Sequence, residues 1–264
     1  MNFGLIIIGD EILSGKREDK HLPMVIELLA RRGLNLAWAR YVGDDPQRIT
    51  ADLKYAFTSE EAVFSCGGIG ATPDDHTRQC AATALNLPLV LHPQARDLIL
   101  ERMRDVAKEK GLAFEPDRHD NLHRLNMGTF PQGADIIPNP YNKIAGFSVG
   151  TVFFVPGFPV MAWPMIEWVL DQRFAHLHRS QTLVEKSIIV FGAMEAALTP
   201  LMESIEARYR GIKVFSLPSV DHPEWGPHIE LGVKGDAPAL ASAYAEMVDG
   251  LKLHGAKLGP ELVR

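Results

Sequence analysis

Short apolar runs alternate with segments of helical spacing along the first two thirds of the chain. The run 5–8 is rich in isoleucine and ends at Gly9 and Asp10, which predicts a strand buried on both faces of a parallel sheet. A helix is predicted over 23–30, ending at Gly33, and a second strand over 34–42. These segments make one β–α–β unit.

The same alternation continues after residue 44, with turn formers between the predicted elements. We predict helices over 45–57, 73–86, 94–110 and 161–174, and strands over 62–66, 136–137 and 152–155. Such alternation is typical of an α/β fold, a three-layer, doubly wound and mostly parallel sheet.

A change of composition at 176–181, rich in histidine and polar residues, marks the expected domain boundary. We therefore predict a first domain over residues 1–178 and a small α+β domain over 179–264. The elements predicted for the second domain are strands over 183–191, 212–216 and 228–233 and helices over 194–209 and 237–251.

The composition limits the partners. The net charge of −6 and the lack of a long basic run argue against binding of nucleic acid or an anionic membrane. Two cysteines in 264 residues fit a reducing compartment. Because the N-terminus has neither a basic leader nor a long apolar run, we expect a cytoplasmic protein without a membrane span. An anionic ligand would need local positive charge.

Candidate chemistry gathers where the predicted strands end, which is where open parallel sheets bind their ligands. The most informative loop is 66–75, Cys-Gly-Gly-Ile-Gly-Ala-Thr-Pro-Asp-Asp. Its three glycines let backbone N–H groups approach an anion, and a helix starting at Thr72 and Pro73 would add its dipole. The loop has neither the Gly-Lys-Ser/Thr ending of a Walker A loop nor the third glycine of a dinucleotide fingerprint.

Helix capping is the competing interpretation of this loop, because Thr72 suits an N-cap and Pro73 a first helical position. Capping does not explain the three glycines or the acids at other strand ends. Asp45 precedes Pro46 and suits a helix cap, which leaves Asp44 without such a role. Carboxylates near a bound phosphate repel it unless a cation lies between them, so the acids suggest Mg²⁺ or a similar hard cation. The acids in question are Glu11, Asp44, Asp74 and Asp75.

Two motifs carry a family resemblance: Gly-Asp-Glu at 9–11 with Ser-Gly at 14–15, and the segment 67–77. They resemble the signatures of the MoaB/Mog molybdopterin-binding family, and the second resembles in particular the N-terminal region of CinA (competence/damage-inducible) proteins. The resemblance runs over residues 3–175, and the small domain is similar to the one that follows in CinA. The C-terminal deamidase domain of CinA has no counterpart here, so we assign no deamidase activity.

The resemblance implies molybdopterin as a ligand and a catalytic, cation-holding pair of acids, Asp44 and Asp75. It also implies a homo-oligomer and a chemistry of pyrophosphate linkages beside a divalent cation, as in ADP-ribose pyrophosphatases or molybdopterin adenylylation. The predicted ligand-binding residues are Gly9, Asp10, Glu11, Ser14, Gly67, Gly68, Gly70, Thr72, Asp74, Thr77, Asn139, Pro140, Pro156 and Gly157.

The sequence departs from the family at four places. Cys66 stands where the family usually has Thr, His21 where it often has Asn, and Met161 where a Glu is common. The segment 142–146 replaces a usual Gly-Thr-Ala-Pro-Gly. Lys143 in this segment is a candidate for the local positive charge, although a solvated loop lysine is the commoner explanation.

Two classes of function follow from these residues. The first is an enzyme that binds a phosphorylated pterin or an adenine-dinucleotide-type ligand and hydrolyses its pyrophosphate bond with a divalent cation. The second is a non-catalytic pterin or nucleotide binding module, or an oligomeric scaffold of molybdenum cofactor metabolism. A nicotinamide-dependent dehydrogenase is disfavoured by the missing third glycine.

Overall fold

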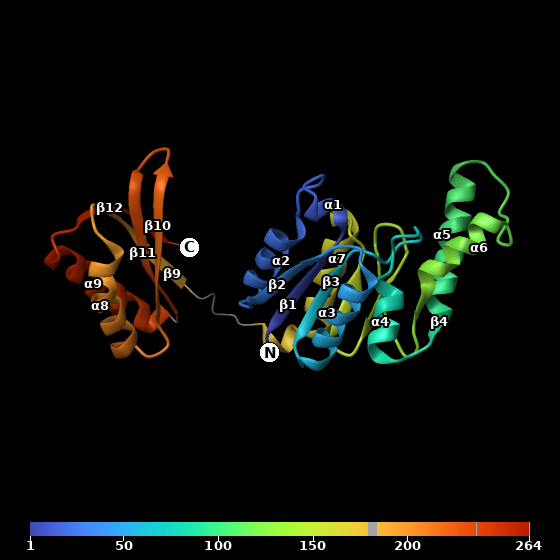
Figure 1. The fold of residues 1–264 in the computed structure, drawn as a ribbon, viewed down its shortest axis with the longest axis horizontal. Coiled ribbons are helices and arrows are strands. Elements are labelled where there is room, and N and C mark those ends of the chain that lie inside the picture. The colour runs from blue at the N-terminus through green and yellow to red at the C-terminus, as the bar shows by residue number, and fades with distance from the viewer. Residues whose placement is uncertain (179–183, 236, 264) are drawn as a thin grey trace. The chain divides into compact units, whose positions relative to one another are not determined.

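The computed structural model describes residues 1–178, 184–235 and 237–263, and contacts divide the chain into two units, Met1–Arg179 and Ser180–Arg264 (Figure 1). Each unit has a hydrophobic core of its own. The boundary predicted between residues 178 and 179 borders the segment 179–183, which lies outside the described residues.

The first unit is built on a six-stranded sheet of order β2-β1-β3-β8-β7-β6. Its strands are β1 (Phe3–Ile8), β2 (Leu36–Val42), β3 (Ala62–Cys66), β6 (Asp135–Ile137), β7 (Gly146–Val149) and β8 (Val152–Val155). The four strands from β2 to β8 run parallel to one another. Strand β7 is antiparallel to β8, and β6 is antiparallel to β7 and so runs in the direction of the first four. The predicted mostly parallel sheet is confirmed.

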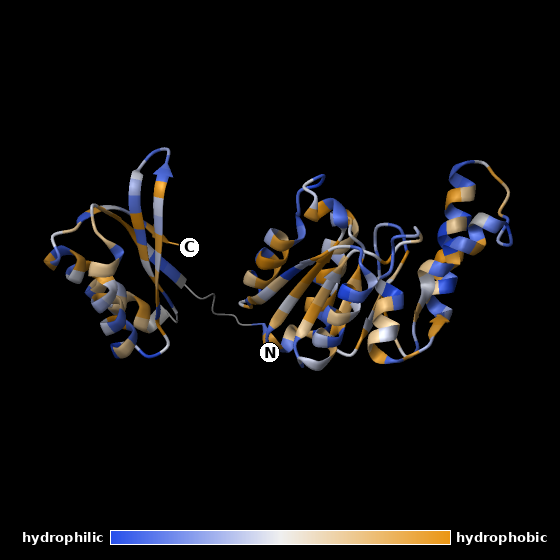
Figure 2. Cartoon of the chain, viewed as in Figure 1, coloured by the Kyte–Doolittle hydropathy of each residue, from blue (hydrophilic) through white to orange (hydrophobic). Residues whose placement is uncertain are grey.

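Helices cover both faces of this sheet (Figure 1), and β1 shows why. Phe3, Leu5 and Ile7 pack in the core formed with α2 (His21–Ala30) and α7 (Pro159–Arg173). Ile6 and Ile8 pack in the core formed with α3 (Pro46–Thr58) and α4 (Thr77–Leu85). All six residues of β1 are buried, so the strand is a continuous apolar run. Figure 2 shows these hydrophobic central strands. A short helix, α1 (Asp10–Leu13), follows β1.

The strand order places a topological switch point between β1 and β3. From β1 the chain adds β2 on one side of it and then crosses to add β3 on the other side. The registers pair Ile8 with Val42, Ile7 with Cys66, and Cys66 with Val155. The carboxyl ends of four parallel strands are therefore level, and the loops after β1 and β3 flank the crevice where such sheets bind ligands.

The start of α4 differs from the prediction. The helix begins at Thr77 and its N-cap is His76, without a side-chain cap bond, so Thr72 and Pro73 do not cap it. Instead Thr72 donates its amide N–H to the Asp75 carboxylate at 2.8 Å, and Asp75 donates its N–H to the Thr72 carbonyl at 3.1 Å. This closed turn holds 72–75 out of the helix.

The N-cap predicted for α3 is confirmed. The Asp45 carboxylate accepts from the N–H groups of Gln47 and Arg48 at 2.8 and 3.0 Å, and Pro46 follows as the first helical residue. Asp44 is thereby left outside the cap and available to the neighbouring loops.

An excursion between α4 and β6 was only partly predicted. Its long helix was expected, but a two-stranded ladder and a second helix were not, because three-residue strands carry little periodicity. Figure 1 shows its helices at one end of the unit. The elements are β4 (Leu89–Leu91), α5 (Pro93–Glu109), α6 (His119–Leu125) and β5 (Thr129–Pro131).

The second unit is an antiparallel sheet of order β10-β11-β9-β12, with two helices packed on it. This confirms the predicted α+β class, although the last strand was not predicted, because Gly259 and Pro260 interrupt its pattern. The elements are β9 (Val184–Phe191), α8 (Glu195–Arg208), β10 (Lys213–His222), β11 (Gly226–Gly235), α9 (Ala237–Leu253) and β12 (Lys257–Val263).

The close approach of β1 and the loop after β3 should make Gly67 irreplaceable. Its φ is +107°, and an added Cβ would collide with the Ile8 carbonyl oxygen. We expect Gly67→Ala to lower the free energy of unfolding by about 2–5 kcal/mol, combining backbone strain and overpacking. Urea denaturation measures this loss.

Gly15→Ala is the matched control for this prediction. Gly15 also has a positive φ, +70°, but an added Cβ meets nothing within 4 Å. We expect a loss of about 1–2 kcal/mol, from the left-handed backbone alone. Equal losses in the two variants would contradict the packing argument.

Candidate functional site

The glycine loop turns sharply at the end of β3. Gly67 donates its N–H to the Val155 carbonyl at 3.0 Å, so the loop leaves the sheet from a paired position. The Gly67 and Gly68 carbonyls then turn back toward α4, where they accept from the Thr77 hydroxyl at 3.0 Å and the Thr77 N–H at 2.9 Å. Positive φ angles of +107° and +67° at the two glycines permit this path.

The amide groups that follow are the main feature of the loop. Within the described part of the chain, the N–H groups of Gly68, Ile69, Gly70 and Ala71 have no hydrogen-bond acceptor. Four successive unpaired donors beside a cleft can bind an anion. The glycines have no side chain that would keep the anion away from the backbone. Ile69 is buried in the core and anchors the loop at its centre.

Two strand-end acids are joined across β1 and β2. Asp10 donates its N–H to the Asp44 carboxylate at 2.9 Å, and Asp44 donates its N–H to the Asp10 carboxylate at 3.1 Å. Burial raises the pKa of Asp44, the Asp10 N–H opposes that shift, and the charges of Asp10, Glu11 and Asp74 add to it. The cluster is therefore short of positive charge.

Asp75 is held in place by the turn that precedes α4. One of its carboxylate oxygens accepts from both the N–H and the hydroxyl of Thr72. Since both bonds go to Oδ2, the Oδ1 atom is left for a cation or a ligand donor. The turn that displaces the helix start is thus the turn that orients a predicted catalytic carboxylate.

These groups line one cleft of about 660 Å³, which is in the usual range for small-molecule sites. Most of the predicted site residues meet there. They are Gly9, Glu11, Asp44, Gly67, Gly68, Gly70, Thr72, Asp74, Asp75, Asn139, Pro156 and Gly157.

Four predicted ligand-binding residues do not line the cleft. Ser14 and Pro140 are exposed elsewhere on their loops, Thr77 is buried under the glycine loop, and Asp10 is joined to Asp44. Thr77 and Asp10 support residues that do line it.

Asn139 lines the cleft with its side chain engaged in its own loop. Its amide nitrogen donates to Asn142 Oδ1 at 2.8 Å and to the Ile144 carbonyl at 2.9 Å, while its oxygen accepts from the Tyr141 N–H. It therefore shapes the loop 139–144, which lies between β6 and β7.

Lys143 does not provide the local positive charge. Its ammonium group lies 2.6 Å from Glu101 and 2.7 Å from Asp105 on α5, which pulls it away from the cleft lining. Arg17 lines the cleft instead, together with Met127 and Phe158. Arg17 closely follows the Ser14–Gly15 motif, and its charge was the signal that sequence reasoning passed over.

A second cavity of about 420 Å³ adjoins the cleft. The residues that line both are Ile8, Glu11, Arg17 and Gly157. His21 and Cys66, two of the departures from the family, line it. His21 is buried, with Nε2 2.9 Å from the Gly157 carbonyl. Cys66 is buried in the core, and burial raises the pKa of its thiol, which disfavours the thiolate form that a nucleophile needs.

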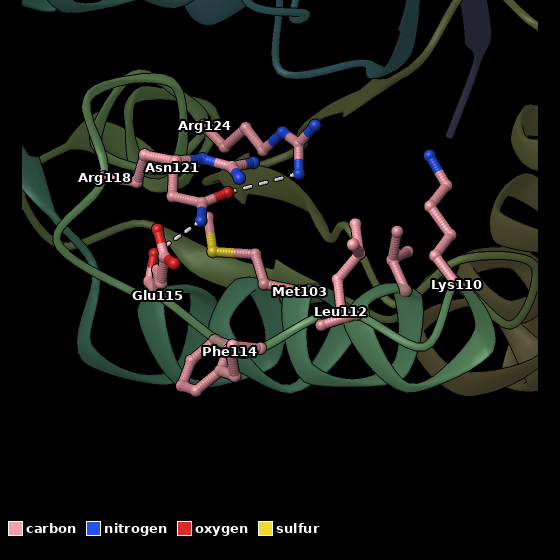
Figure 3. A pocket seen from close by; sticks show the side chains of 11 residues that line it. Met103, Lys110, Leu112, Phe114, Glu115, Arg118, Asn121 and Arg124 are labelled. Atoms are coloured by element: carbon pink, nitrogen blue, oxygen red, sulfur yellow. Dashed lines mark hydrogen bonds between the residues drawn. The ribbon is translucent and has the colours of Figure 1, made fainter.

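A much smaller cavity of about 60 Å³ lies between α5 and α6 (Figure 3). Its polar groups bond to one another, because Asn121 donates to the Glu115 carbonyl at 2.6 Å and accepts from Arg124 at 3.2 Å. None of the predicted site residues lines it. We interpret it as a packing gap between the two helices.

No cluster of three or more potential metal ligands occurs in the described ranges of the chain. Over the same ranges, none of the helices combines the length and apolar character needed to cross a bilayer.

A doubly wound α/β domain with its cleft at the switch point is the class that this fold and site define. The chain belongs to the family described as "Probable molybdopterin binding domain", whose model matches residues 4–176. This confirms the predicted molybdopterin-binding type of domain.

The relatives extend the likeness to CinA. The chain is 30% identical over 259 residues to a CinA-like protein of Anaeromyxobacter dehalogenans, covering 95% of this chain and 60% of the relative. It is 28% identical over 274 residues to a CinA-like protein of Geobacter metallireducens, covering 100% of this chain and 61% of the relative. The chain thus spans about three fifths of the length of these two relatives.

A solved structure agrees with this assignment. The structure of a CinA protein of unknown function from Thermoplasma acidophilum is similar with a TM-score of 0.53 and 25% identity. The match covers 65% of this chain and 98% of that one. The predicted resemblance to the N-terminal region of CinA is confirmed.

The raised pKa of Asp44 gives a pH-dependent prediction. A raised folded-state pKa means that Asp44 contributes stability only while protonated, and that contribution is lost as pH rises through the folded pKa. We expect Asp44→Asn to raise Tm by about 1–4 °C at pH 8 with chelator present, and to raise it less near pH 4. Calorimetry at the two pH values measures the difference.

Asp45→Asn is the control for Asp44→Asn. Asp45 is the neighbouring acid and caps α3, and asparagine caps a helix about as well as aspartate. We expect its Tm to be unchanged or slightly lower at pH 8, since a favourable dipole interaction is lost. A fall in Tm for Asp44→Asn at pH 8 would contradict the charge crowding.

Proposed function

We propose that the first unit binds a phosphorylated pterin or an adenine-dinucleotide-type ligand and hydrolyses its pyrophosphate bond with a divalent cation. The observation that carries this proposal is the run of four unpaired amide groups from Gly68 to Ala71, facing acids across one cleft. Amide donors suit phosphate oxygens, whereas the acids alone would repel them.

The donor set fits a hard cation that is shared with the ligand. Asp44 and Asp75 each have one carboxylate oxygen engaged in the loop structure. Mg²⁺ is usually held by one or two carboxylates together with substrate phosphates and waters. A site that lacks a complete protein cage therefore agrees with a cation that binds together with the phosphate.

Each part of the cleft has a task in this proposal. The amides of 68–71 hold phosphate oxygens, and Asp44 and Asp75 hold the cation from opposite strand ends. A divalent cation supplies positive charge where negative charge develops on the phosphoryl oxygens. Asp10 and Thr72 fix the orientation of the two carboxylates, so little reorganisation is needed when the ligand binds.

A non-catalytic binding module is the second candidate, and the altered loops favour it. Met161 stands where the family often has Glu, and its sulfur lies 3.3 Å from the Asn142 amide nitrogen. This wall of the cleft thereby lacks an acid that could position water or metal. An oligomeric scaffold without a ligand is the limiting form of this candidate.

The homo-oligomer and the cytoplasmic location stay predictions.

An assay of substrate hydrolysis distinguishes the enzyme from the non-catalytic binding module. Purified protein is incubated with ADP-ribose, FAD or ATP in the presence of Mg²⁺, Mn²⁺ or Co²⁺, and products are resolved by chromatography. We expect hydrolysis of at least one compound, and a loss of at least about 100-fold in Asp75→Asn, since a cation ligand is removed. Asp97→Asn, on the exposed face of α5, should match the wild type.

Binding measurements interpret a negative result. Calorimetric binding without turnover would support the module, and no binding to any phosphorylated pterin or nucleotide would support the scaffold. The enzyme proposal is abandoned if no compound is turned over and Asp75→Asn behaves as the wild type does.

A further inference from the structure

Arg78 lies beneath the glycine loop and was not among the predicted site residues. It is the second residue of α4 and is only 5% exposed. Its Nη2 donates to the Gly70 carbonyl, while its Nε has no partner within the described part of the chain. The side chain is therefore a buried cation in direct contact with a residue that lines the cleft.

The charge of Arg78 is not balanced by a protein ion pair. None of the ion pairs among the described residues includes it, and Asp75 is the acid that acts on it electrostatically. Burial lowers the pKa of the guanidinium, and Asp75 opposes this shift. The side chain also starts from the first turn of a helix, where the dipole is positive and disfavours a cation.

Arg32 is another largely buried arginine, and its charge is balanced by two acidic side chains. The Arg32 side chain is 11% exposed, and it lies 2.6 Å from Asp171 and 3.3 Å from Glu167. A buried charge without a partner is costly, so pairing of this kind is the usual solution. Arg78 lacks it, and the open cleft next to Gly70 is where an anion can approach.

The contact with Gly70 also orients a donor. In a trans peptide the C=O and N–H groups point in opposite directions. Because Arg78 holds the Gly70 carbonyl beneath the loop, the Ala71 N–H is turned to the other side. Ala71 lines the cleft, and its N–H is one of the four unpaired donors.

We propose that Arg78 is the anion-positioning residue of this cleft, a buried cation whose charge is balanced by the phosphate of the ligand and which sets the direction of the Ala71 N–H. The inference rests on the proposed function in taking the ligand to be a phosphate ester. It assigns Arg78 a role in binding through the loop and no contact with the bond that breaks.

The test uses inorganic pyrophosphate with Mg²⁺ as the probe and calorimetry on the full chain. We expect Arg78→Met to weaken binding at least tenfold, and Arg78→Lys, which keeps the charge, to recover most of that loss. Arg48→Met is the control, because Arg48 is an exposed arginine in the first turn of α3 and lies outside the cleft lining. It should bind as the wild type does.

A second readout separates binding from a purely structural role. Removal of an unbalanced buried charge should leave the Tm of ligand-free Arg78→Met equal to or above that of the wild type. Pyrophosphate should raise Tm less in this variant than in the wild type. A variant that melts several degrees lower without ligand and binds pyrophosphate as tightly as wild type would overturn the inference.

The outcomes also distinguish this inference from the proposed function. If wild type binds pyrophosphate or ADP-ribose and Arg78→Met binds equally well, Arg78 has no role in binding and the proposed function stands. If the wild type binds neither compound, the proposed function fails and the role of Arg78 fails with it.

Discussion

The parallel pairing of β3 with β1 is the interaction on which the site depends. It places Cys66 level with Ile7, so the glycine loop passes over the last residues of β1. An added Cβ at Gly67 would meet the Ile8 carbonyl, which shows how closely the two strand ends approach. The acids after β1 and β2 come within reach of the amides after β3 only because of this pairing, which in turn requires β1 to be apolar on both faces.

The charges of the cleft are unevenly distributed between its two sides. On the β1 and β2 side, Asp44 is crowded by Asp10 and Glu11, and its pKa is raised. On the loop side, unpaired amides lie above the guanidinium of Arg78. A protein with a net charge of −6 can therefore still offer a strongly local positive surface to an anion, next to acids that attract a cation. The phosphate ester and divalent cation of the proposed function would satisfy both sides.

Features that depend only on neighbouring residues in the sequence were predicted correctly. The Asp45-Pro46 cap and the buried run at 5–8 follow from side-chain chemistry and periodicity, and both were predicted. The start of α4 was missed, because the Asp75 carboxylate competes for the Thr72 N–H and closes a turn where capping rules favour a helix. The ion pairs of Lys143 could not be predicted for a different reason, since its partners Glu101 and Asp105 lie 42 and 38 residues away in the sequence.

The sequence by itself determined the doubly wound class, the glycine loop as a candidate anion site and most residues of the cleft. These depend on periodicity, on glycine conformational freedom and on the rule that ligands bind at strand ends. Only the tertiary structure decided which groups contact one another. It formed the reciprocal hydrogen bonds between Asp10 and Asp44, and it buried Arg78 beneath the Gly70 carbonyl. Burial and long-range pairing depend on how distant segments pack, and no local pattern of residues records this.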